Sequence, residues 1–88
     1  MHYTDPIAIG AAEYNVLEMV AWGDTLVLGF PSTGLLMWKP GDAKGKRMGF
    51  AEGLPGQAIG RMYIDRMVNP PQLLVPTEGG LAVVRALP

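Results

Sequence analysis

The sequence predicts an all-β protein, and three observations lead to this prediction. Twelve glycines and eight prolines interrupt the 88 residues every few positions. No segment keeps an apolar period of 3.6 residues over about 12 positions without one of them, as a stable helix would. The apolar residues instead form short runs bounded by turn residues, and one such pattern occurs twice along the chain.

Each apolar run between turn residues is expected to form one strand. The expected strands are Val16–Trp22, Leu26–Phe30, Leu35–Lys39, Lys46–Phe50, Ile59–Asp65, Leu73–Thr77 and Leu81–Ala86, with a short additional strand at Met1–Thr4. Gly23-Asp24 is a suitable tight turn, because glycine tolerates positive φ and Asp bonds its own backbone. The segment Ala8–Met19 is the only helix candidate, and its Gly10 and Asn15 argue against a helix.

The two halves of the chain align as an internal repeat of about 45 residues. The aligned pairs are Val16 with Ile59, Met19 with Met62, Leu26 with Leu73, Leu28 with Val75, and Gly34-Leu35 with Gly80-Leu81. The offset changes only in turns, first at a loop that contains Pro70-Pro71 and then by one residue. Loops tolerate insertions that strands do not, so this pattern is typical of two copies of one supersecondary unit.

The repeat resembles the two-component-regulator type of β-propeller repeat. The matching residues are Leu26–Phe30 with Gly34-Leu35, and Leu73–Thr77 with Gly80-Leu81, and Glu52–Pro55 is similar to the segment between blades. The likeness covers about residues 15–86. It implies two four-stranded antiparallel blades, and a period near 45 residues with four short strands fits that architecture.

The sequence departs from the repeat pattern of that family at three points. The aromatic residue of the second strand is missing from both copies. Gly29 of the first copy corresponds to Pro76 of the second, and Phe30 stands where Thr77 matches the family pattern. The motif concerns folding, so the resemblance implies no catalytic residue.

We expect residues 1–88 to form a single domain of two blades. Blade one spans about 15–50, and blade two spans about 58–86. Blade two lacks its fourth strand, and residues 1–4 precede the first inner strand much as Arg47–Phe50 precedes the second. We therefore predict that residues 1–4 form an outer-strand clasp, supplied by a neighbouring subunit.

The composition favours a homo-oligomer. Only 17% of the residues are charged and 49% are apolar, which suggests that another chain covers part of the surface. Each blade is apolar on both faces, and propellers close with roughly 4–8 blades. Three copies would give a six-bladed ring, which we favour, and four copies would give an eight-bladed ring. The competing interpretation is a fragment of a longer propeller.

Charge and residue types exclude several classes of partner. The net charge of −1 argues against nucleic acid, and no apolar run is long enough for a membrane span. Without cysteine and with one histidine, no metal site or cofactor is expected. The start of the chain lacks the pattern of a signal peptide, so we expect a cytoplasmic protein or a part of a soluble particle.

No residue pattern indicates an enzyme. The segment Gly41–Arg47 resembles a phosphate-binding loop only superficially, because its glycines are too close and Arg47 replaces the Ser or Thr that binds Mg²⁺. His2 has no nucleophile or carboxylate beside it at a useful spacing. We therefore predict a non-enzymatic structural or interaction module.

The alternative function is a small lectin-like carbohydrate- or ligand-binding propeller. Its sites would lie between blades and would use Trp22, Trp38, Arg61 and Glu78, because sugar sites combine aromatic faces with charged groups. Partial burial of both Trp side chains between the blades is the competing explanation. Partners would then be other copies of the chain, other proteins of a larger assembly, or a glycan.

Overall fold

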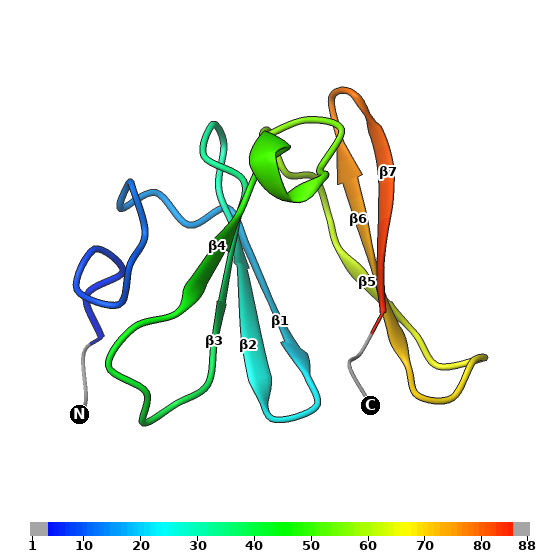
Figure 1. Ribbon diagram of the computed structural model, residues 1–88, viewed down its shortest axis with the longest axis horizontal. Helices are drawn as coiled ribbons and strands as arrows, with labels where there is room; N and C mark the ends of the chain where they lie inside the picture. The colour runs from blue at the N-terminus through cyan, green and yellow to red at the C-terminus, as the bar shows by residue number, and fades with distance from the viewer. Residues whose placement is uncertain (1–3, 86–88) are drawn as a thin grey trace.

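The computed structural model describes residues 4–85. These residues form two antiparallel sheets, which appear next to each other in Figure 1. The first sheet has the order β1-β2-β3-β4 and the second has the order β5-β6-β7. The strands are β1 (Glu18–Trp22), β2 (Thr25–Gly29), β3 (Leu35–Trp38), β4 (Lys46–Met48), β5 (Tyr63–Asp65), β6 (Gln72–Thr77) and β7 (Gly80–Arg85). The predicted all-β class is confirmed: residues 4–85 contain no α-helix and only one 3₁₀ turn, η1 (Phe50–Glu52).

The first sheet follows directly from the turn residues in its sequence. Gly23 adopts φ of 62° in the turn between β1 and β2, and Gly34 adopts φ of 80° before β3. These left-handed conformations cost glycine little, because it has no Cβ. Each turn brings the next apolar run back antiparallel, so all four strands expected between residues 16 and 50 form. Three are shorter than expected, and β2 begins and ends one residue earlier than expected.

The second sheet differs from the prediction at its first strand. Regular pairing in β5 begins at Tyr63, whereas we expected a strand from Ile59. Ile59 forms only an isolated bridge to Thr77, and its N–H donates to the carbonyl of Phe30, which directly follows β2 of the first sheet. Ile59 therefore links the two sheets. The expected strand at Met1–Thr4 lies largely outside the described residues, and Thr4 is not in a strand.

The strand pairing in the two sheets matches position for position. In the first sheet Val27 is opposite Met37 and Leu28 is opposite Leu36. In the second sheet the aligned residues pair in the same way, since Leu74 is opposite Val83 and Val75 is opposite Ala82. The first two strands of each sheet agree as well. Val20 is opposite Val27 in the first sheet, and their aligned residues Tyr63 and Leu74 are opposite each other in the second.

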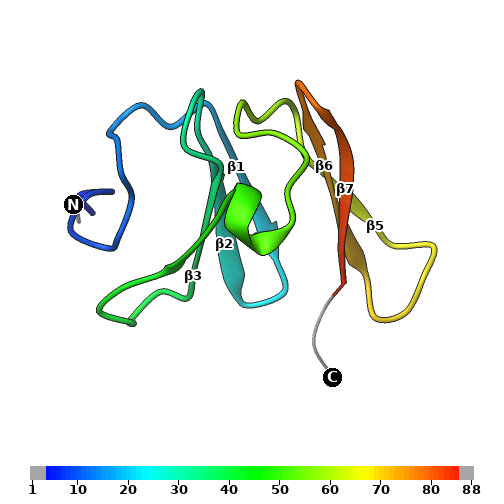
Figure 2. The same cartoon turned by 45° about the horizontal axis from the view of Figure 1, so that its top comes forward.

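The main core lies between the two sheets, and they face it with opposite sides. Val27 and Leu35 of the first sheet are fully buried there. Leu73 and Val75 of the second sheet are buried in the same core. Their aligned residues in the first sheet, Leu26 and Leu28, lie on the side of that sheet facing away from the core. The sheets are therefore stacked front to back. Residues 49–62 pass between them, with Leu54 in the core (Figure 2).

A segment before β1 covers part of the far side of the first sheet. Ile9 and Ala11 pack with Leu28, Phe30 and Leu36 in a second cluster. The N–H of Gly45 donates to the carbonyl of Ile9, and the Glu13 carboxylate accepts hydrogen bonds from the hydroxyls of Ser32 at 3.0 Å and Thr33 at 2.7 Å. This segment therefore covers part of one outward face of the sheet pair.

The Glu13 contact predicts a pH-dependent attachment of this segment. The Thr33 hydroxyl is the largest cause that lowers the pKa of Glu13, and the Ser32 hydroxyl and N–H add to it. A carboxyl whose pKa is depressed by folding contributes stability above its unfolded pKa, and this contribution is lost as the pH falls through the folded value. In Glu13→Gln we expect a small loss of stability at neutral pH and a flatter melting-temperature profile below about pH 4.5. An unchanged acid profile would contradict this role for Glu13.

Candidate functional site

The outward face of the second sheet is apolar and exposed. Tyr63, Leu74 and Val83 lie in one row across β5, β6 and β7, and Pro76 and Leu81 form the next row. Tyr63 is 58% exposed and Leu81 is 62% exposed. We call these five residues the β5–β7 face. They form an exposed apolar surface on the side of the second sheet that faces away from the core.

A second exposed apolar area lies on the opposite side of the molecule, at β1. Met19 is 57% exposed, and Ala21, on the same face of the strand, is exposed as well. Leu17, immediately before the strand, is 56% exposed. We call these three residues the β1 patch. The covering segment packs on residues of β2 and β3 and leaves β1 uncovered.

A cleft of about 840 Å³ opens between the two sheets. Residues of the β1–β2 turn and of the β5–β6 loop line it. Both of these connections lie in the lower part of Figure 1. Trp22 lines the cleft, and the indole Nε1–H of Trp22 donates to the carbonyl of Pro71 at 2.9 Å. That hydrogen bond spans the two sheets and orients the ring at the cleft.

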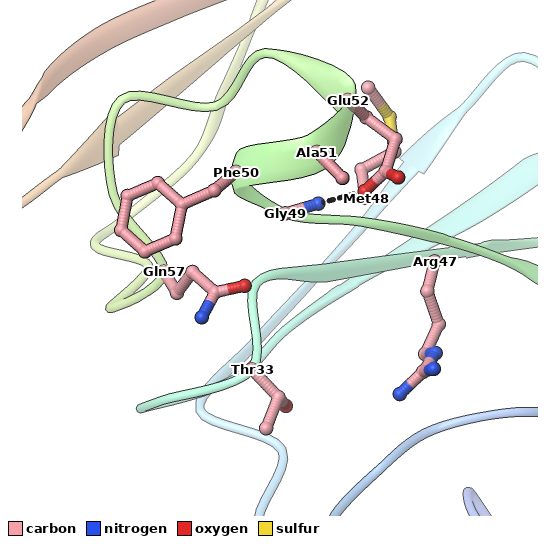
Figure 3. A pocket seen from close by; sticks show the side chains of 8 residues that line it. All are labelled: Thr33, Arg47, Met48, Gly49, Phe50, Ala51, Glu52 and Gln57. Atoms are coloured by element: carbon pink, nitrogen blue, oxygen red, sulfur yellow. Dashed lines mark hydrogen bonds between the residues drawn. The ribbon is translucent and has the colours of Figure 1, made fainter.

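A smaller polar hollow of about 500 Å³ lies beside η1 (Figure 3). Phe50 and Arg47 stand on opposite sides of it, with Gln57 and Thr33 between them. The Glu52 carboxylate accepts the N–H of Gly49 at 2.6 Å, which closes the turn. A Cβ at Gly49 would meet the side-chain oxygen of Gln57, so a larger residue there would displace the Gln57 side chain.

The four residues predicted to bind a ligand do not lie together within one chain. Trp22 packs toward the core between the sheets, and Trp38 packs toward the second cluster on the other face of the first sheet. Arg61 is exposed just before β5. The Glu78 carboxylate accepts the N–H groups of Gln57 and Ala58, both at 2.7 Å, and so ties a turn to a loop. Only Trp22 lines one of the two pockets described above.

Sequence reasoning missed the residues that line the rest of the cleft. Lys44 and Lys46 come from one segment at the start of β4 and Arg85 from the end of β7, and their convergence depends on how the sheets stack. The local concentration of basic residues between positions 39 and 47 is the signal in the sequence that could have indicated part of this rim. Within residues 4–85, no group of three or more His, Cys, Asp or Glu side chains could hold a metal ion.

The chain was compared with protein-family models, with curated proteins and with solved structures, and no match was found in any of the three comparisons. The described part of the chain also contains no helix with the length and apolar character that crossing a bilayer requires.

Proposed function

We propose that this chain is a non-enzymatic interaction module that assembles head to tail with copies of itself. In this assembly the β5–β7 face of one copy contacts the β1 patch of the next. Each contact then repeats, between chains, the front-to-back stacking of the two sheets within one chain.

The burial of aligned residues supports this proposal most directly. Leu35 is 0% exposed in the core between the sheets, whereas its aligned residue Leu81 is 62% exposed on the β5–β7 face. Met62 is 3% exposed in the same core, whereas its aligned residue Met19 is 57% exposed in the β1 patch. Leu81 and Met19 therefore occupy positions whose counterparts in the other copy of the repeat are buried in the core between the sheets.

A head-to-tail contact forms a closed ring when the rotation between copies permits it. We propose a ring of three copies with six sheets, and a ring of four copies with eight sheets is the alternative. A specific contact of this kind buries about 1,200–2,000 Å² in total. The propeller architecture and its resemblance to known repeats are part of this proposal.

The unpaired edge of the second sheet supports the strand clasp as part of the same assembly. Within residues 4–85, β7 pairs only with β6, whereas the corresponding strand β3 pairs on both sides. The first described segment of the chain lies on the far side of the molecule from β7 (Figures 1 and 2). We therefore propose that residues 1–4 of a neighbouring copy add to β7.

Two charge substitutions test the head-to-tail contact by complementation. Leu81→Arg should block the β5–β7 face, and Met19→Arg should block the β1 patch, because a charge buried without a partner is costly. We expect light scattering to give a mass of three or four times 9.4 kDa for the unsubstituted chain and about 9.4 kDa for each variant alone. An equimolar mixture should form a 1:1 dimer, because each variant retains the face that the other has lost.

The matched control is Ala43→Arg, which adds the same charge on the exposed β3–β4 loop and should leave the mass unchanged. A monomeric unsubstituted chain at micromolar concentration would rule out the proposal. Loss of assembly in Leu81→Arg without recovery in the mixture would instead indicate a symmetric contact between two β5–β7 faces. The same measurement on a chain lacking residues 1–4 tests the clasp, and an unchanged mass would exclude it.

A further inference from the structure

The cleft between the sheets combines an apolar floor with a basic rim. Trp22, Met37, Met48 and Val84 line it, and each is a half-buried side chain at the open end of the core between the sheets. Packing against these four residues would remove more of their apolar surface from water, which is favourable in proportion to the area covered.

The charged groups around the cleft are predominantly positive. Four cationic and two anionic side chains line it, although the whole chain has a net charge of −1. Lys39 is already paired with Asp24 at 3.7 Å. Lys44, Lys46 and Arg85 form no ion pair with any residue of the described chain. This end of an otherwise slightly acidic molecule therefore offers three cationic groups to a negatively charged partner.

We propose that this cleft binds an amphipathic organic anion. The apolar part of the ligand lies against Trp22 and Val84, and its acidic group faces Lys44, Lys46 and Arg85. The volume of about 840 Å³ is within the range of about 300–1,000 Å³ that small-molecule sites occupy. The cleft lies within one chain, so this site does not depend on the proposed assembly.

The chemistry of the cleft favours such an anion over a neutral sugar. A sugar site needs several polar groups aimed at hydroxyls, whereas the floor of this cleft is apolar and its Trp22 N–H is already bonded to Pro71. Long side chains such as Lys46 reach an acidic group while their methylenes cover apolar surface. An aromatic or aliphatic carboxylate satisfies both parts of the cleft.

Three matched probes separate the contributions of the ring and the charge. 1-Naphthoate has both, 1-naphthylmethanol keeps the ring without the charge, and acetate keeps the carboxylate without the ring. We expect titration of the ¹³C-methyl signals of methionine to give saturable shifts of Met37 and Met48 with naphthoate. Met19 and Met67, which are 57% and 94% exposed elsewhere on the surface, should not move. They report unspecific adsorption of an aromatic molecule.

Neutralising the rim tests the assignment of the charge. In Lys44→Gln/Lys46→Gln/Arg85→Gln we expect naphthoate to bind about tenfold more weakly, because its carboxylate loses the three exposed cationic groups that attract it. The binding of naphthylmethanol should stay unchanged. The control Arg47→Gln/Arg61→Gln/Arg66→Gln removes the same charge from exposed positions outside the cleft and should retain the affinity for naphthoate.

Three results would overturn the proposal. The first is equal affinity for naphthoate and naphthylmethanol, which would make the charges irrelevant. The second is a shift of Met19 and Met67 parallel to that of Met37 and Met48, which would indicate unspecific adsorption. The third is the absence of any saturable shift at millimolar naphthoate while the methyl spectrum remains that of a folded protein.

Discussion

Leu35→Ala is expected to lower the free energy of unfolding by about 2–5 kcal/mol, the usual cost of truncating a buried leucine. Leu35 is 0% exposed and lies in the core between the two sheets. An 88-residue domain has about 4–13 kcal/mol of stability in total. The loss therefore removes a large part of it and should lower the melting temperature by roughly 10–30 °C.

Leu81→Ala is the matched control, because it makes the same chemical change at the aligned position of the second copy. Leu81 is 62% exposed, so in a dilute, unassembled sample the substitution should change the free energy of unfolding by less than about 0.5 kcal/mol. Urea unfolding followed by the fluorescence of Trp22 and Trp38 measures both values. Equal losses in a sample shown to be monomeric would contradict the front-to-back stacking of the sheets.

Gly34→Ala is expected to cost about 2–5 kcal/mol, from the sum of a backbone conformation and a steric contact. Gly34 has φ of 80°, and a left-handed conformation costs a residue with a Cβ about 1–2 kcal/mol. The added Cβ would also meet the carbonyl oxygen of Met48 in β4. Overpacking of this kind typically adds about 1–3 kcal/mol, because the backbone of β4 must shift.

Gly23→Ala separates these two contributions. Gly23 also has a positive φ, of 62°, but a Cβ there would have no atom within 4 Å. We therefore expect only the backbone cost of about 1–2 kcal/mol. Thermal unfolding of both variants measures the difference, which is the cost of the contact with β4. A Gly34→Ala variant no less stable than Gly23→Ala would show that β4 yields freely.

The N–H of Gly34 further explains why this turn is sensitive. It donates to the carbonyl of Gln57 at 2.9 Å, and the carbonyl of Gly34 accepts the N–H of Phe30 at 3.0 Å. The first bond joins the β2–β3 turn to the segment between the sheets. A shift of the turn would therefore disturb the connection between the sheets as well as one hairpin.

Much of the local structure could be predicted from the residues alone. The turn residues Gly23-Asp24 and Gly34 and the apolar runs beside them predicted hairpins that form near the expected positions. The aligned pairs predicted equivalent strands, and the cross-strand partners of Val27 and Leu74 agree with that alignment. These features depend on neighbours close in sequence, so the local pattern is sufficient to predict them.

The candidate sites were less predictable, because they depend on contacts between distant segments. Trp22 and Trp38 are the same residue type and each is the last residue of a strand, yet they lie on opposite faces of the first sheet. The side that each faces is decided by strand register and by what packs there. Lys44 and Arg85 both line the cleft only because the two sheets stack on each other, which no local pattern predicts.

The dipeptides Gly34-Leu35 and Gly80-Leu81 show where this boundary lies. Their common sequence determined that each opens a strand after a tight turn, because glycine and the apolar run act locally. Only the tertiary structure decided that Leu35 is buried and Leu81 is exposed. The physical reason is that burial depends on whether another sheet covers the face, and no local sequence pattern specifies that cover.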